Sequence, residues 1–127
     1  MTNNYQKREY HFYIYIMSNY QRSTFYIGFT NNIIRRVIEH KHELGSYFTK
    51  KYKLKYLVYF EEYQYVNQAL AREKELKGWI REKKINLIKQ FNLSMKDLGS
   101  ELLKDFGITA EETRKYIDEI KKFYIKK

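Results

Sequence analysis

With 127 residues, the chain is long enough to bury one modest core but too short for two full domains. Its 25 Lys and Arg against 15 Asp and Glu give a net charge of +10, which favours a polyanionic partner, and the absence of cysteine excludes disulfides and thiolate metal sites. No apolar run approaches the roughly 20 residues of a membrane span, and the polar, disordered segment expected at 1–9 lacks the apolar core of a secretory signal. We therefore expect a cytoplasmic protein with a nucleic-acid partner and no membrane contact.

The first half of the chain predicts a β-hairpin, a helix and a third strand. Two aromatic and β-branched runs, 10–17 and 24–29, indicate the hairpin. After the N-cap residues at 30–32, apolar residues recur at helical spacing up to Gly45, which we interpret as the C-cap. A basic, aromatic loop over 46–55 leads into a strand at about 54–61.

The second half predicts helices. Apolar spacing indicates one helix over about 66–80 and a short one over about 85–91, which gives the order ββαβαα. Two more helices are expected, near 95–105 and from Thr109, whose capping box includes Glu112. The last helix carries an apolar stripe that must dock on the domain or on a second subunit; its members are Tyr116, Ile117, Ile120 and Phe123. The fold class is α+β, with a small three-stranded antiparallel sheet flanked by helices over 10–98 and a C-terminal helical appendage over 99–127.

Glu73 stands out in the helix over 66–80. At 100° per residue it falls inside the apolar arc, which comprises Val66, Ala69, Leu70, Leu76 and Ile80, so we expect it to face the core. An ionised carboxylate there needs a partner. An ion pair with a nearby Arg or Lys and a bound metal ion both satisfy this need, and helical geometry does not decide between them.

Arg36 and His40 lie four residues apart on one face of the first helix, while Arg35 aligns with Glu39 as a surface pair. Guanidinium and imidazole groups together can hold a phosphate. The alternative is that both side chains simply edge the core and meet solvent. The 14 tyrosines leave a similar choice, because most should be core aromatics, and one can act as a general base only if a cation or metal lowers its pKa.

The hairpin contains Tyr13-Ile14-Tyr15 and Tyr26-Ile27-Gly28, with ten residues between the last tyrosine of the first motif and the first of the second. This pair resembles the motif of the GIY-YIG nucleases, except that Tyr13 stands where the family has Gly. Two later segments, 32–40 and 71–74, resemble the family's phosphate-binding helix and its metal-binding segment. The likeness is to compact stand-alone bacterial members, and more distantly to the nuclease domain of the bacterial excision-repair nuclease.

The resemblance implies a role for each matching residue. Tyr15 would be the general base or water-activating hydroxyl, Tyr26 a second hydroxyl at the scissile phosphate, Arg36 the phosphate clamp, His40 an auxiliary hydrogen-bonding group, and Glu73 the ligand of Mg²⁺ or Mn²⁺. The run 87–98 resembles a family tail in which an asparagine precedes Pro. This tail would give Asn92 or Asn86 a supporting role, although Leu93 follows Asn92 here.

The function implied is metal-dependent hydrolysis of DNA phosphodiester bonds by an endonuclease, in DNA repair, recombination or processing. Residues 1–92 carry 17 Lys and Arg against 8 Asp and Glu, so the DNA-facing part is expected there and the appendage outside the catalytic site. Within the loop 46–55 we expect backbone contacts to DNA from Tyr47, Lys50, Lys51, Tyr52 and Lys53. The alternatives are a nucleic-acid-binding module that has lost catalysis, and an interaction protein that assembles through its last helix.

Overall fold

The computed structural model describes residues 11–125, so the segment 1–9 lies outside the described residues. In chain order the elements are β1 (Phe12–Ser18), β2 (Phe25–Thr30), α1 (Ile33–Lys41), α2 (Tyr47–Lys51), β3 (Tyr56–Tyr63), α3 (Val66–Lys77), α4 (Arg81–Phe91), α5 (Leu98–Asp105) and α6 (Ala110–Ile125). None of the helices described is long and apolar enough to cross a membrane.

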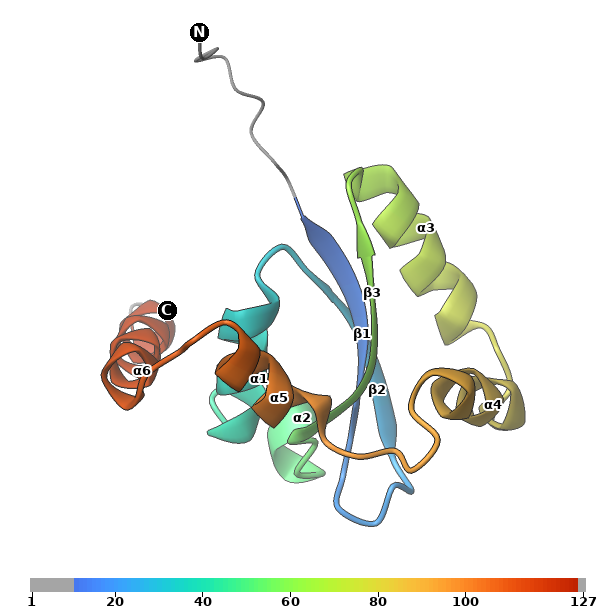
Figure 1. Ribbon diagram of the computed structural model, residues 1–127, viewed down its shortest axis with the longest axis horizontal. Helices are drawn as coiled ribbons and strands as arrows, with labels where there is room; N and C mark the ends of the chain where they lie inside the picture. Colours follow the sequence, from blue (N-terminus) through green and yellow to red (C-terminus); the bar gives the residue numbers. More distant parts are fainter. Residues whose placement is uncertain (1–10, 126–127) are drawn as a thin grey trace, which may run out of the picture.

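The three strands form an antiparallel sheet in the order β2-β1-β3. In the register, Tyr15 of the central strand lies opposite Gly28 of β2 and Phe60 of β3. Helices α1, α2, α5 and α6 lie on one side of the sheet and α3 and α4 on the other (Figure 1). This arrangement confirms the expected α+β fold with flanking helices and a C-terminal helix.

Because both faces of the sheet are covered, nearly all of β1 is buried. Its side chains alternate between the two faces and pack into two separate cores. Tyr13, Tyr15 and Met17 pack with the inner face of α1. Ile14 and Ile16 pack with α3 and α4 on the opposite face. The side chain of Tyr15 is thereby directed towards α1.

Two expected boundaries were wrong. Helix α1 ends at Lys41 and its C-cap is His42, so Gly45 does not end it. The expected loop over 46–55 contains a one-turn helix, α2, whose N-cap Ser46 accepts a hydrogen bond from the backbone N–H of Thr49 at 3.3 Å. A helix this short has too few positions to show an apolar period, and it forms because its cap and the buried Thr49 fix the turn.

The C-terminal helices pack on the same domain. Helix α5 lies against β3, and the capping box of α6 forms as expected, with Thr109 and Glu112 exchanging backbone-to-side-chain hydrogen bonds of 3.0 Å each. Ile120 is fully buried against the α1 side of the core, where the half-buried Tyr116 and Ile117 also pack. The stripe was expected to dock on the domain or on a second subunit, and these three of its residues pack on the domain.

Candidate active site

Tyr15 lies at the centre of the candidate site and is 2% exposed. Its ring crosses the backbone of the edge strand β2 at Gly28, its cross-strand partner. A Cβ at position 28 would lie 2.4 Å from both the hydroxyl oxygen and the Cζ atom of Tyr15, which no side chain could tolerate. The glycine of the Tyr26-Ile27-Gly28 motif is therefore required to give space to the tyrosine of the first motif.

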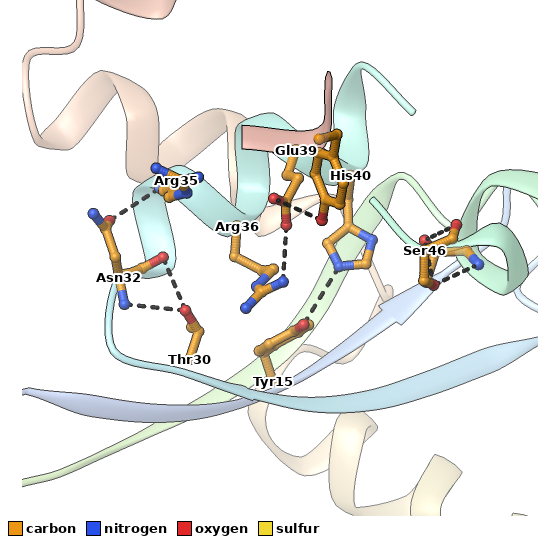
Figure 2. A network of polar contacts seen from close by, with 10 residues as sticks. Tyr15, Thr30, Asn32, Arg35, Arg36, Glu39, His40 and Ser46 are labelled. Carbon is orange, nitrogen blue, oxygen red and sulfur yellow. Dashed lines mark hydrogen bonds and ion pairs between the residues drawn. The ribbon is translucent and has the colours of Figure 1, made fainter. Parts of the chain in front are cut away.

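Three of the expected site residues meet as a cluster of rings. The ring centroid of His40 lies 5.7 Å from that of Tyr15 and 5.9 Å from that of Tyr26, and the two tyrosine centroids lie 6.3 Å apart. The Tyr15 hydroxyl and His40 Nε2 are 3.4 Å apart, within hydrogen-bonding distance (Figure 2). Tyr15 and His40 are buried and Tyr26 is half-buried, so Tyr26 lies nearest the surface.

Arg36 joins this cluster from α1, but it has a different partner from the one expected. Its Nη1 atom donates to Oε1 of Glu39 at 2.8 Å, so Glu39 pairs with Arg36 and not with Arg35 (Figure 2). Glu39 is only 4% exposed, and it pairs with the guanidinium three residues before it in the chain. Although burial lowers the pKa of Arg36, the nearby Tyr15 and Glu39 raise it above its ordinary value, which keeps the cation charged.

His40 is neutral at neutral pH. Burial lowers its pKa to about 4, and the positive charge of Arg36 acts in the same direction. A neutral imidazole can accept a proton at one ring nitrogen and donate at the other. The imidazole is thus in a form that can hydrogen-bond to Tyr15 in either direction.

The hydroxyl of Tyr15 is also neutral. A general-base tyrosine was expected to need a cation to lower its pKa, and Arg36 does lower it. However, burial raises the pKa of Tyr15 more strongly, and the charges of Glu39 and Glu73 raise it further, so the net shift is upward. The protein as it stands therefore holds Tyr15 as a proton-bearing hydroxyl next to a neutral imidazole.

Glu73 lies on α3, which packs on β1 and β2 from the side of the sheet opposite α1 (Figure 1), and its charge raises the pKa of Tyr15. Its side chain is 19% exposed, so the carboxylate expected to face the core is only partly buried. Lys77, one turn further along, pairs with it at 3.2 Å and is itself 55% exposed. The ion pair considered as an alternative partner is therefore present.

The apolar arc proposed for this helix is narrower than expected. Val66, Leu70 and Ile80 are exposed, and Ile80 lies beyond the end of α3. Spacing alone places a residue around the helix axis, whereas the sheet covers only a narrow strip of this helix.

A divalent cation at Glu73 would need ligands from outside the protein. Within 11–125, no three His, Asp or Glu side chains gather where they could hold a metal ion. Mg²⁺ and Mn²⁺ bind through one or two carboxylates and keep water or substrate phosphate as the remaining ligands. The partly exposed carboxylate of Glu73 could supply one such protein ligand.

Neither asparagine considered for a supporting role contacts the cluster. The buried amide of Asn92 donates to the carbonyls of Val58 and Lys96 at 3.0 and 2.9 Å, and it accepts from the Lys96 N–H at 3.2 Å. Asn92 thus ties the connection between α4 and α5 to β3. Asn86 is exposed on α4, on the other side of the sheet from α1.

The five residues expected to contact DNA form an exposed basic surface on α2 and the turn that follows it. Tyr47 is 77% exposed and Tyr52 is 42% exposed, with the ammonium of Lys51 lying 5.9 and 5.4 Å from their ring centroids. Lys50 and Lys53 are also exposed. The ring of Tyr52 connects this surface to the site through Phe48, whose centroid is 4.8 Å from that of Tyr52 and 6.2 Å from that of Tyr26.

A hollow of about 360 Å³ extends this surface towards the turn between β1 and β2. Tyr20, Tyr56 and Lys55 line it together with the expected Lys51 and Tyr52. Lys55 belongs to the loop that was expected to contact DNA. Sequence reasoning missed Tyr20 and Tyr56 because they come from separate elements, and no spacing rule relates a hairpin turn to the start of β3.

Comparisons with known proteins show which family and which relatives the chain resembles. The model of the family described as the GIY-YIG catalytic domain matches residues 11–86. UPF0213 proteins of Staphylococcus aureus strains Mu3 and N315 are each 38% identical to the chain over 65 residues, which cover 51% of this chain and 79% of theirs. The solution NMR structure of the UPF0213 protein BH0048 from Bacillus halodurans is 26% identical, with a TM-score of 0.42, and the match covers 63% of this chain and 84% of that one.

Proposed function

Since the chain belongs to the GIY-YIG catalytic domain family, a family of nucleases, we propose that it is a metal-dependent endonuclease that hydrolyses phosphodiester bonds in DNA. The observation that carries the proposal is the convergence of the Tyr15 hydroxyl, the neutral His40 and the charged Arg36 beside a basic, aromatic surface. Arg36 would bind the scissile phosphate, and Tyr26, the more exposed hydroxyl, would contact it from β2.

Tyr15 and His40 together would take the proton of the attacking water. As the water oxygen bonds to phosphorus, the bond from phosphorus to the leaving sugar oxygen would break, and that oxygen would take a proton from solvent. The Tyr15 oxygen would accept a proton of the attacking water and pass the original hydroxyl proton to His40 Nε2, which becomes an imidazolium and then releases the proton to solvent. A phosphate bound to Arg36 offsets the positive charge that helps to keep the pKa of His40 low, so substrate binding makes the imidazole a better acceptor. This relay needs no tyrosinate in the free protein.

Glu73 would hold the divalent cation, which when bound supplies positive charge to the phosphate oxygens. Lys77, which pairs with Glu73, is largely exposed and can turn towards solvent. The surface of α2 would bind the DNA backbone on either side of the cut, where lysines neutralise phosphates without regard to sequence.

Cleavage of supercoiled plasmid, with Mg²⁺, with Mn²⁺ and with EDTA, tests this proposal. We expect nicked and linear products only with metal, no products from Glu73→Gln, and normal products from the matched control Lys77→Gln. Binding of DNA without cleavage under any of these conditions would favour a module that has kept the fold and lost catalysis. Cleavage in EDTA, or by Glu73→Gln at the wild-type rate, would contradict the metal role.

A further inference from the structure

Glu39 is a carboxylate buried next to the candidate phosphate clamp. Its side chain is 5% exposed, against 36% for its ion-pair partner Arg36. A charged group that is taken out of water is costly unless partners satisfy it. Arg36 satisfies Oε1 at 2.8 Å, which leaves the second carboxylate oxygen in need of a donor.

That donor comes from the C-terminal helix. The hydroxyl of Tyr124 lies 3.5 Å from Oε2 of Glu39 and donates to it, across 85 residues of sequence. Helix α6 is held in this place by Ile120, which is fully buried, and it packs against α1. Tyr124 lies outside the segment 11–86 that matches the family model, so the contact is a feature of this chain's C-terminal extension.

These contacts restrict Arg36 before any substrate arrives. If the guanidinium swung out to solvent, Glu39 would be left buried without its cation, so the extended rotamers of Arg36 are disfavoured. The guanidinium has five N–H donors in a fixed fork. Nη1 of Arg36 is turned to Glu39, and another nitrogen of the guanidinium points away from Glu39 (Figure 2). The positive charge of the guanidinium lowers the pKa of Tyr15.

We propose that Glu39 and Tyr124 are positioning residues that hold Arg36 in the orientation that receives the scissile phosphate, so that α6 is part of the catalytic apparatus. The effect of Glu39 and Tyr124 on catalysis rests on the proposed function. On this proposal residues 99–127, which were expected outside the catalytic site, would contribute to it through the contacts from Tyr124 to Glu39 and from Glu39 to Arg36. A side chain fixed in advance loses less conformational entropy when its ligand binds.

Tyr124→Phe tests the proposal, because it removes one hydroxyl and leaves the ring in place. Tyr116→Phe is the matched control on the same helix, since Tyr116 also packs against the core but its hydroxyl has no hydrogen bond among the described residues. We expect Tyr124→Phe to lower kcat by about two- to tenfold with KM nearly unchanged, because the variant loses one hydrogen bond. Tyr116→Phe should leave both constants at their wild-type values.

A second measurement does not depend on cleavage. In side-chain NMR spectra, rotation about the Cζ–Nη bonds of Arg36 should be slow in the wild-type protein and in Tyr116→Phe, and faster in Tyr124→Phe and Glu39→Gln. If the wild-type protein cuts no DNA but this difference appears, the positioning contacts stand and the proposed function fails. If the protein cuts DNA and Tyr124→Phe matches the wild type in both kcat and Arg36 rotation, the positioning role is overturned.

Discussion

His40 couples the stability of the protein to pH, because it is buried in its neutral form. Burial first, and then the charge of Arg36, lower its pKa from 6.5 to about 4. At pH values between about 4 and 6.5, the unfolded chain therefore binds a proton at His40 more readily than the folded chain does. The stability that this group contributes is fully present above pH 6.5 and is lost as pH falls towards 4.

The size of this effect follows from the two pKa values. One pKa unit corresponds to about 1.4 kcal/mol, so the shift of His40 amounts to about 3 kcal/mol, of which about 2 kcal/mol should be lost between pH 7 and pH 5. This is a large share of a typical unfolding free energy of roughly 5–15 kcal/mol. Carboxylates with lowered pKa, such as Glu61 and Asp97, lose their contributions at lower pH, because their ordinary values are 4.5 and 3.8.

Urea unfolding at several pH values from 7.5 to 5 measures the effect. His40→Phe should be less stable than the wild type at pH 7, because the Tyr15 hydroxyl loses its partner, but its unfolding free energy should change little down to pH 5. The matched control His42→Gln, an exposed histidine two residues away, should retain the wild-type slope. If the wild type and His40→Phe lose stability in parallel, His40 is not held neutral by burial and the proton relay loses its acceptor.

Two further substitutions test the geometry of the site. Gly28→Ala should destabilise the protein by about 1–3 kcal/mol and abolish cleavage, because the new methyl group would displace the hydroxyl of Tyr15; an active, normally stable variant in plasmid and thermal unfolding assays would contradict this packing. Arg36→Lys should keep the ion pair with Glu39 and most of the stability but lose the two-pronged grip on phosphate, so kcat should fall at least tenfold, whereas Arg35→Lys should cut plasmid at the wild-type rate. Equal losses from the two lysine variants would show that a general basic surface, and not a clamp, had been identified.

The resemblance to the GIY-YIG family singled out the candidate site residues, and local pattern accounts for how some of them are oriented. The spacing of Arg36 and His40 puts both on one helix face, and the alternation of β1 gives Tyr15 the same face as Tyr13. The capping box at Thr109 likewise depends on residues three apart, and it formed as expected. Periodicity and capping describe neighbours within one element, and they gave the order of the elements except for the one-turn helix α2.

What the sequence could not decide depends on which elements meet and how much water they exclude. Helical spacing predicted that Glu39 is a surface partner of Arg35. In the folded protein Glu39 pairs with Arg36 and accepts a hydrogen bond from Tyr124 of α6. The upward pKa shift of Tyr15 likewise arises from burial between the sheet and α1. Helical spacing fixes the angle of a side chain around its own axis, but desolvation and contacts between residues as far apart as 39 and 124 are set only when the helices pack.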